Sequence, residues 1–195
     1  SMYLDVINSS SIPSSKHIWK VKVPLKIKVF IWFVHKQVIL TKDNLAKRNW
    51  TGPTRCSFCD RDETIKHLFL DCPLAKVLWR TVHIAFNITP PNSVSTLFGM
   101  WLNGIEAETA RHIRVGVCAL LWAVWNCRND LVFNRTTNFH FLQVIFRATA
   151  LILMWSLLTP REARERLVTG SIRWEMVARD IFNRFGWRSC NRIDN

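Results

Sequence analysis

The sequence predicts an all-α fold, in which a small helical domain containing a zinc knuckle is followed by a helical bundle. Apolar residues recur at helical spacing in most segments after residue 73. A Cys-x2-Cys pair is followed by a histidine and a third cysteine, the ligand types of structural zinc. Half of the 195 residues are apolar, ten of them tryptophan, so the chain can bury a core. We expect a zinc-binding domain over 17–88 and a helical domain over 89–195.

The first segments allow more than one interpretation. Residues 1–16 are polar and serine-rich, and we expect a flexible lead. Residues 19–29 alternate lysine with apolar residues, which is the period of a strand. Helical spacing also fits, because Pro24 could begin a helix with one apolar stripe, formed by Leu25, Val29, Trp32, Phe33 and Leu40. Thr41 is expected to cap a short helix over 42–48.

The most informative motif is Cys56-x2-Cys59 followed by His67 and Cys72. Two cysteines on one tight turn can bind a metal ion with both thiolates, and a brief helix over 64–71 would supply the histidine. The five-residue step to Cys72 leaves that helical face, so the helix must end there, and Pro73 is placed to end it. Four protein ligands leave no open position, so we expect one structural Zn²⁺.

Two other interpretations of these cysteines are weaker. Single thiols often serve as small buried apolar groups, but four ligand-type residues at knuckle spacing favour zinc. Secreted disulfides would need a signal peptide, and residues 1–15 have no basic segment followed by an apolar one. We therefore expect an intracellular protein, in nucleus or cytoplasm, and leave a mitochondrial destination open.

Several of these segments resemble one known family. Residues 17–32 (HIWKVKVPLKIKVFIW), residues 41–50 (TKDNLAKRNW) and the cysteine–histidine motif resemble the zinc-binding reverse-transcriptase domain of plant non-LTR, LINE-type retrotransposons. Asn49 departs from that pattern, because glycine is usual there. A weaker similarity over Trp122–Asn134 matches the W-x-x-W-x-x-R-N segment that follows this domain.

The resemblance implies a fold and an origin. It favours a helix from about Pro24 over the strand, and it implies structural zinc on the four cysteine and histidine ligands. It also implies the C-terminal part of a retroelement open reading frame, without its polymerase or ribonuclease H.

The remaining sequence predicts helices and one linker. Residues 74–86 have an apolar helical face, and Asn87–Asn92 with Pro90-Pro91 indicates a linker. Further helices are predicted over 93–103, 106–134, 138–158, 160–168 and 171–185. The apolar runs 115–125 and 148–158 are shorter than the about 20 residues of a membrane span, so no transmembrane segment is predicted.

No catalytic constellation is specified by the sequence. A polymerase needs paired carboxylates for two metal ions, and the chain contains no Asp-Asp pair. Its 14 acidic residues are scattered, mostly beside basic ones, and its glycines form no phosphate loop. We therefore expect a protein that is not an enzyme.

The net charge of +13 favours a polyanionic partner. The first hypothesis is a module that binds RNA or single strands non-specifically, mainly through backbone phosphates. Trp50 or Phe58 could stack on unpaired bases. The candidate basic contacts are Lys20, Lys22, Lys26, Lys28, Arg55, Arg61 and Lys66.

Two further hypotheses involve other partners. The alternative is a domesticated host module that binds or regulates a protein, in which zinc serves only folding and the aromatic, arginine-rich C-terminal half forms the interface. Association of segments 111–128 or 139–158 with an anionic membrane ranks last, because they are apolar on several faces and carry little charge. The oligomeric state stays open.

Overall fold

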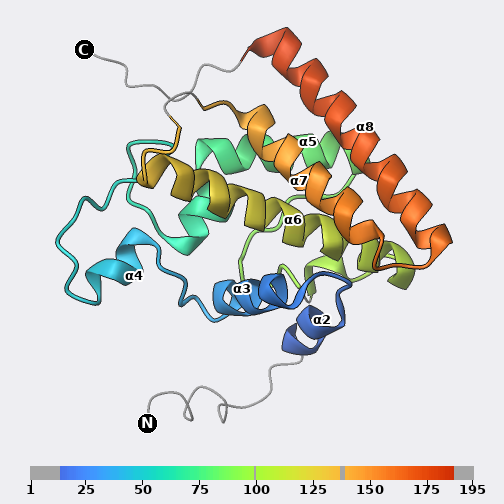
Figure 1. Cartoon of the computed structure of the whole chain (residues 1–195), viewed down its shortest axis with the longest axis horizontal. Coiled ribbons are helices and arrows are strands. Elements are labelled where there is room, and N and C mark those ends of the chain that lie inside the picture. Colours follow the sequence, from blue (N-terminus) through green and yellow to red (C-terminus); the bar gives the residue numbers. More distant parts are fainter. Residues whose placement is uncertain (1–13, 99, 137–138, 187–195) are drawn as a thin grey trace.

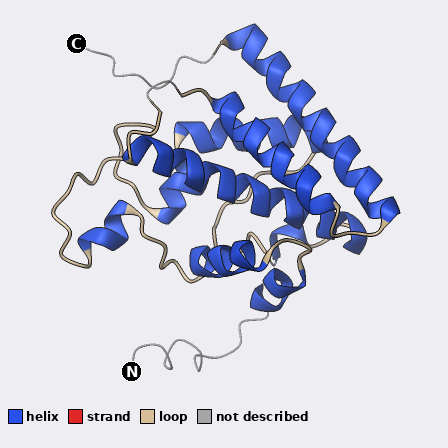
Figure 2. Ribbon diagram, in the orientation of Figure 1, coloured by secondary structure: helices blue, strands red, loops and turns tan. Residues whose placement is uncertain are grey.

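The computed structural model describes residues 14–98, 100–136 and 139–186, and most of the predicted lead lies outside them. Within these ranges the chain forms helices and loops without a strand, which confirms the all-α class (Figure 2). The elements are α2 (Ser14–Lys20), α3 (Leu25–His35), α4 (Lys42–Ala46), the π-helix η1 (His67–Asp71), α5 (Pro73–Phe86), the 3₁₀-helix η2 (Met100–Leu102), α6 (Ala107–Val132), α7 (Phe141–Ser156) and α8 (Arg161–Phe185).

Helices α6, α7 and α8 lie side by side, and α7 packs against both of its neighbours (Figure 1). Helix α5 packs against α7 and α8, whereas α3 packs against α6. One cluster of buried apolar side chains runs from Ile18 in α2 to Ala178 in α8, so both halves of the chain contribute to it. The division into domains near residue 88 stays a prediction.

Helix α6 is the longest element, and both of its ends are closed by local hydrogen bonds. The Glu106 carboxylate accepts the backbone N–H groups of Glu108 at 2.9 Å and Thr109 at 2.8 Å, which pairs donors that a helix start leaves free. The middle of α6 is buried on several faces, and Ala119 and Leu121, which lie on different sides of the helix, are both fully buried. None of the helices described is long and apolar enough to cross a membrane.

Two predictions for the C-terminal half are wrong in detail. In the predicted helix over 93–103, the described residues 93–98 and 100–103 form turns and a short 3₁₀-helix instead of an α-helix. The separate helices over 160–168 and 171–185 are one continuous helix, α8, which passes through Gly170. Glycine costs about 1 kcal/mol in a helix interior, but packing against α5 holds the helix, with Trp174 Nε1 donating to Thr81 Oγ1 at 2.7 Å.

The N-terminal segments also correct the sequence interpretation. Residues 14–16 belong to helix α2 and not to a flexible lead. The alternation over 19–29 does not form a strand, and the helix implied from Pro24 is confirmed as α3. The predicted stripe of α3 is wrong, because Leu25 is exposed and the buried positions are Ile27, Phe30, Ile31 and Val34. Helices α2 and α6 pack against α3, and the sequence did not reveal which face they would cover.

Candidate metal centre

The first two candidate ligands lie on a narrow hairpin-like loop over residues 54–63, here called the metal loop. An isolated antiparallel bridge joins Arg55 to Asp62, and the backbone N–H of Cys56 donates to the Arg61 carbonyl at 2.7 Å. At the tip, the Phe58 N–H donates to Cys56 Sγ at 3.4 Å. This turn brings the thiols of Cys56 and Cys59 to the same side of the loop.

The other two candidate ligands begin and follow a π-turn. The Thr64 hydroxyl accepts the His67 N–H at 3.0 Å at the start of this turn. The Cys72 N–H then donates to the His67 carbonyl at 2.7 Å, an i→i+5 bond in place of the i→i+4 bond of an α-helix. The wider turn brings two residues five positions apart to one face. The helix predicted over 64–71 therefore exists, but its last turn is π.

The four candidate ligands converge on one point. Their ligand atoms all lie within 4.8 Å of one another, close to the about 3.8 Å that separates thiolates around a tetrahedral ion with bonds of about 2.3 Å. Cys59 Sγ lies 3.2 Å from His67 Nε2 and 3.9 Å from Cys72 Sγ. Cys56, His67 and Cys72 are buried and Cys59 is partly exposed. The donors thus fit a closed Cys3His zinc site.

The thiol pKa values show why this cluster suits a cation. The pKa of Cys56 is lowered to about 4, chiefly by a side-chain hydrogen bond from Cys72 and further by His67. The pKa of Cys72 is raised, first by that same bond and then by burial, and burial raises the pKa of Cys59. One thiolate therefore suppresses ionisation of the others, and a divalent ion supplies the positive charge that lets all three ionise.

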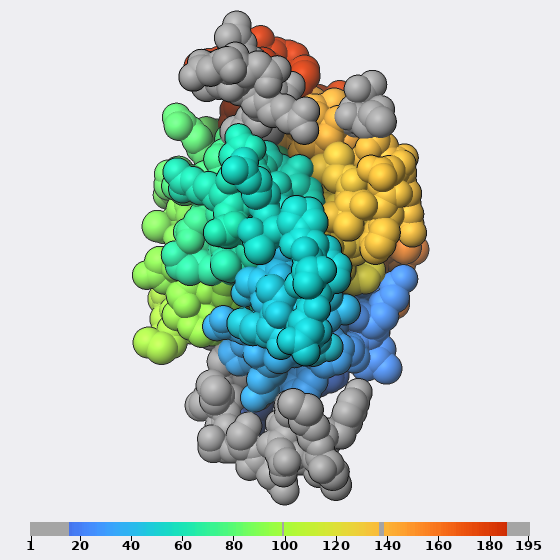
Figure 3. Space-filling model, turned by 90° about the vertical axis from the view of Figure 1, so that its left-hand side faces the viewer, coloured from blue at the N-terminus to red at the C-terminus, as the bar shows by residue number. Residues whose placement is uncertain are grey.

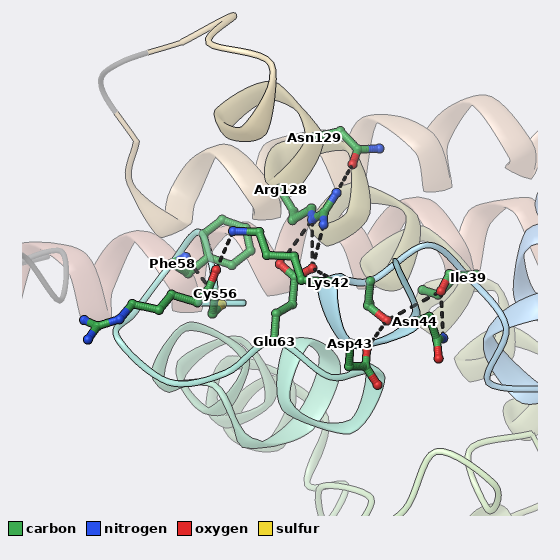
Figure 4. A network of polar contacts seen from close by, with 11 residues as sticks. Ile39, Lys42, Asp43, Asn44, Cys56, Phe58, Glu63, Arg128 and Asn129 are labelled. Atoms are coloured by element: carbon green, nitrogen blue, oxygen red, sulfur yellow. Dashed lines mark hydrogen bonds and ion pairs between the residues drawn. The ribbon is translucent and has the colours of Figure 1, made fainter. Parts of the chain in front are cut away.

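A buried ion pair connects the metal loop to helix α6 (Figure 4). Glu63, the last residue of the loop, is fully buried and accepts from Arg128 of α6, with Nη2 to Oε1 at 2.6 Å and Nε to Oε2 at 3.1 Å. Arg128 also donates to Asn129 Oδ1 at 3.0 Å. Neither residue is among the site residues predicted from the sequence, although an arginine beside Cys127 in an apolar helix signals a buried partner.

The same carboxylate corrects the predicted cap of α4. Glu63 Oε1 accepts the Lys42 N–H at 3.0 Å at the start of that helix. The Thr41 side chain makes no capping bond and donates to Asp43 Oδ1 at 2.5 Å instead. The Lys42 ammonium donates to the Arg55 carbonyl of the metal loop. Helix α4, the metal loop and α6 therefore share one polar network (Figure 4).

The seven basic residues predicted to contact nucleic acid differ in whether their side chains already have partners. Lys28 Nζ donates to the Trp19 carbonyl at 2.9 Å, Arg55 pairs with Asp60, and Lys66 pairs with Asp71. The others are exposed and have no ion-pair partner among the described residues; they are Lys20, Lys22, Lys26 and Arg61. Three of these four lie on α2, α3 and the short connection between them.

The two predicted stacking aromatics differ in availability. The ring of Phe58 packs against Phe139 at a centroid distance of 5.0 Å. Trp50 is exposed, and its indole lies where a side chain on Gly52 would be. The metal loop occupies the middle of the face seen in Figure 3, with the N-terminal segment and the start of α7 beside it.

These observations define a class of protein: a helical protein with a closed Cys3His knuckle braced by a buried ion pair. Residues 1–79 match the family described as zinc-binding in reverse transcriptase, which confirms the resemblance found in the sequence. The family match and the ligand cluster together support a single structural zinc ion. Both findings fit a retrotransposon-derived chain.

One curated relative extends this comparison. The chain is 32% identical over 63 residues to an Arabidopsis thaliana protein named "Putative ribonuclease H protein". The matched part is 32% of this chain and only 10% of that protein. No solved structure matches the chain.

Proposed function

We propose that the chain is a non-catalytic retroelement-derived module, in which structural zinc on Cys56, Cys59, His67 and Cys72 maintains a basic surface that binds RNA or single-stranded nucleic acid. The observation that carries the proposal is the group of exposed lysines without ion-pair partners among the described residues, Lys20, Lys22 and Lys26, inside the matched family segment. Ammonium groups of this kind neutralise phosphates and do not read base sequence.

The test is the salt dependence of binding to a labelled single-stranded RNA by zinc-loaded protein. Neutralising these three lysines together to glutamine should weaken binding and reduce the slope of log affinity against log salt by about 2, since each phosphate contact on a single strand contributes about 0.7. The matched control removes three exposed charges of α8, with Arg161→Gln, Arg173→Gln and Arg184→Gln combined. Equal losses in both triple variants would contradict the lysine surface.

The alternative function is a protein-interaction module that the host has kept. One observation favours it: the end of α7 and the residues that follow it expose large apolar side chains, Leu153, Met154, Leu157 and Leu158. Exposed apolar groups in such proximity often mark protein contacts. Weak RNA binding that does not depend on the lysines would favour this alternative, and pull-downs with wild type and Leu157→Asp would then follow.

A further inference from the structure

A cavity of about 560 Å³ lies between the C-terminal part of α6 and α7, outside the metal centre. Its volume falls in the range of about 300–1,000 Å³ typical of small-ligand sites. Ala150, Leu151 and Met154 of α7 contribute an apolar wall, whereas Asn126 and Asn129 of α6 contribute amides. The cavity therefore offers an apolar wall beside polar groups.

An exposed aromatic ring stands at the rim of this cavity because of how α6 ends. Asn134 adopts a left-handed conformation with φ 52°, and the Arg135 N–H donates back to the Asp130 carbonyl at 2.8 Å. Together with the bond from the Asn134 N–H to the Leu131 carbonyl, this is a Schellman motif. It leaves Phe133 63% exposed and folds the Arg135 guanidinium over its ring, 5.5 Å from the centroid.

Two arginines are held at the cavity by one carboxylate. Asp130 pairs with Arg147 of α7 at 2.5 Å and with Arg135 at 3.7 Å. Both arginine side chains are exposed and keep further N–H donors for a ligand. Because this acid is the one acidic residue among those described that line the cavity, the site carries net positive charge and presents mainly donors.

We propose that this cavity binds one base of a single-stranded nucleic acid, stacked on Phe133, with an adjacent phosphate at Arg135 and Arg147. Bases and phosphates are rich in acceptors, and exposed aromatic rings beside arginine are the usual platform for unpaired bases. The inference rests on the proposed function and adds a base contact to its phosphate contacts. Asn129 lines the cavity and accepts from Arg128, so the site adjoins the metal-loop network (Figure 4).

The test compares a nine-nucleotide RNA with the same strand carrying abasic sites, which retains the phosphates and lacks the bases. Zinc-loaded wild type should bind the intact strand about tenfold more tightly, the size of one base–aromatic stack. Phe133→Ala should reduce this ratio to about one without changing zinc content or melting temperature. Phe185→Ala, which truncates another exposed ring, is the matched control.

The combined lysine variant separates the two proposals. It should weaken binding of both strands and keep their ratio, because it removes phosphate contacts alone. A ratio that Phe133→Ala leaves unchanged would overturn the cavity site, while salt-dependent binding through the lysines would stand and Phe133 would be reassigned to a protein contact. Absence of binding to either strand at low salt would overturn both proposals.

Discussion

The metal loop and the stack of α6, α7 and α8 are stabilised by different interactions. In the loop and the segment before it, residues 47–55 are exposed except for the partly exposed Gly52, and the buried residues are Cys56 and Glu63. In the stack, apolar side chains such as Leu121 and Ile145 are fully buried. The loop has too little apolar area to hold its shape, so it depends on a metal ion and an ion pair. The stack follows ordinary helix packing.

Removing the metal should have the largest effect on stability, and this effect should be confined to the metal loop and its surroundings. Zinc binding contributes about 10–16 kcal/mol in small zinc fingers, where it is largely folding energy. Chelation or Cys59→Ser is expected to unfold the segment around the loop while α6, α7 and α8 stay helical. Hydrogen exchange resolved by residue would measure this.

The control for the metal prediction is Cys118→Ala, which truncates a buried cysteine of α6 outside the ligand cluster. It should retain one zinc ion per chain. A Cys59→Ser protein with wild-type zinc content and melting temperature would refute the ligand assignment.

The ion pair between Glu63 and Arg128 connects the two regions, and breaking it should have the next largest effect. Arg128→Met would leave a buried carboxylate without its partner, which costs about 3–5 kcal/mol. The double variant with Glu63→Gln should lose less than the sum of the two single variants. Denaturant unfolding and chelator competition would both be measured, because zinc affinity should fall together with stability.

An exposed ion pair provides the control for that prediction. Arg161→Gln removes the pair with Glu165, whose side chains are 90% and 68% exposed, and should cost less than about 0.5 kcal/mol. If Arg128→Met were as mild as Arg161→Gln, the two regions would not be coupled through this pair.

Removing a buried side chain from the stack should lower the stability of the protein without lowering its zinc affinity. Leu121→Ala would remove a fully buried side chain and is expected to destabilise the protein by about 2–5 kcal/mol. Zinc affinity of the folded protein should stay near that of wild type, because this side chain lies outside the metal site. A large loss of zinc affinity, measured by chelator competition under native conditions, would show that the metal loop depends on the stack.

The all-α class and the positions of most helices could be predicted, because periodic apolar residues and a metal motif are local signals. The spacing from Cys56 to Cys72 was sufficient to predict the ligand cluster. The spacing predicted that the helix carrying His67 ends at Cys72, but it did not predict a π-turn, since the choice between i→i+4 and i→i+5 bonds depends on the metal geometry. Gly170 suggested a break in α8 that packing against α5 prevents.

The ion pair that supports the metal loop could not be predicted in the same way. Glu63 and Arg128 are 65 positions apart, and neither residue indicates its partner. The same limit explains the wrong cap of α4, where a distant carboxylate takes the place of the local hydroxyl of Thr41. Similarly, Phe133 and Arg147 become neighbours of one cavity only when α7 packs on α6.

The smallest expected effect concerns the N-terminal cap of α6. The pKa of Glu106 is lowered to about 2, first by the hydrogen bond from the Thr109 side chain and then by the backbone N–H groups that it accepts. A lowered folded-state pKa adds stability above the ordinary pKa of about 4.5, and this contribution disappears as the pH falls through about 2. Because the carboxylate is exposed, the effect should be local to the first turn of the stack.

Carboxyl and amide NMR shifts across this pH range would test the cap without interference from acid release of zinc. The Glu106 carboxyl should titrate with a midpoint near 2, and the Thr109 amide shift should follow the same curve. In Glu106→Gln that amide should no longer respond, whereas Glu162→Gln at the uncapped start of α8 should leave the response intact. A Glu106 midpoint near 4.5 would show that the first turn of α6 frays in solution, and that even the stack depends on packing and not on its caps.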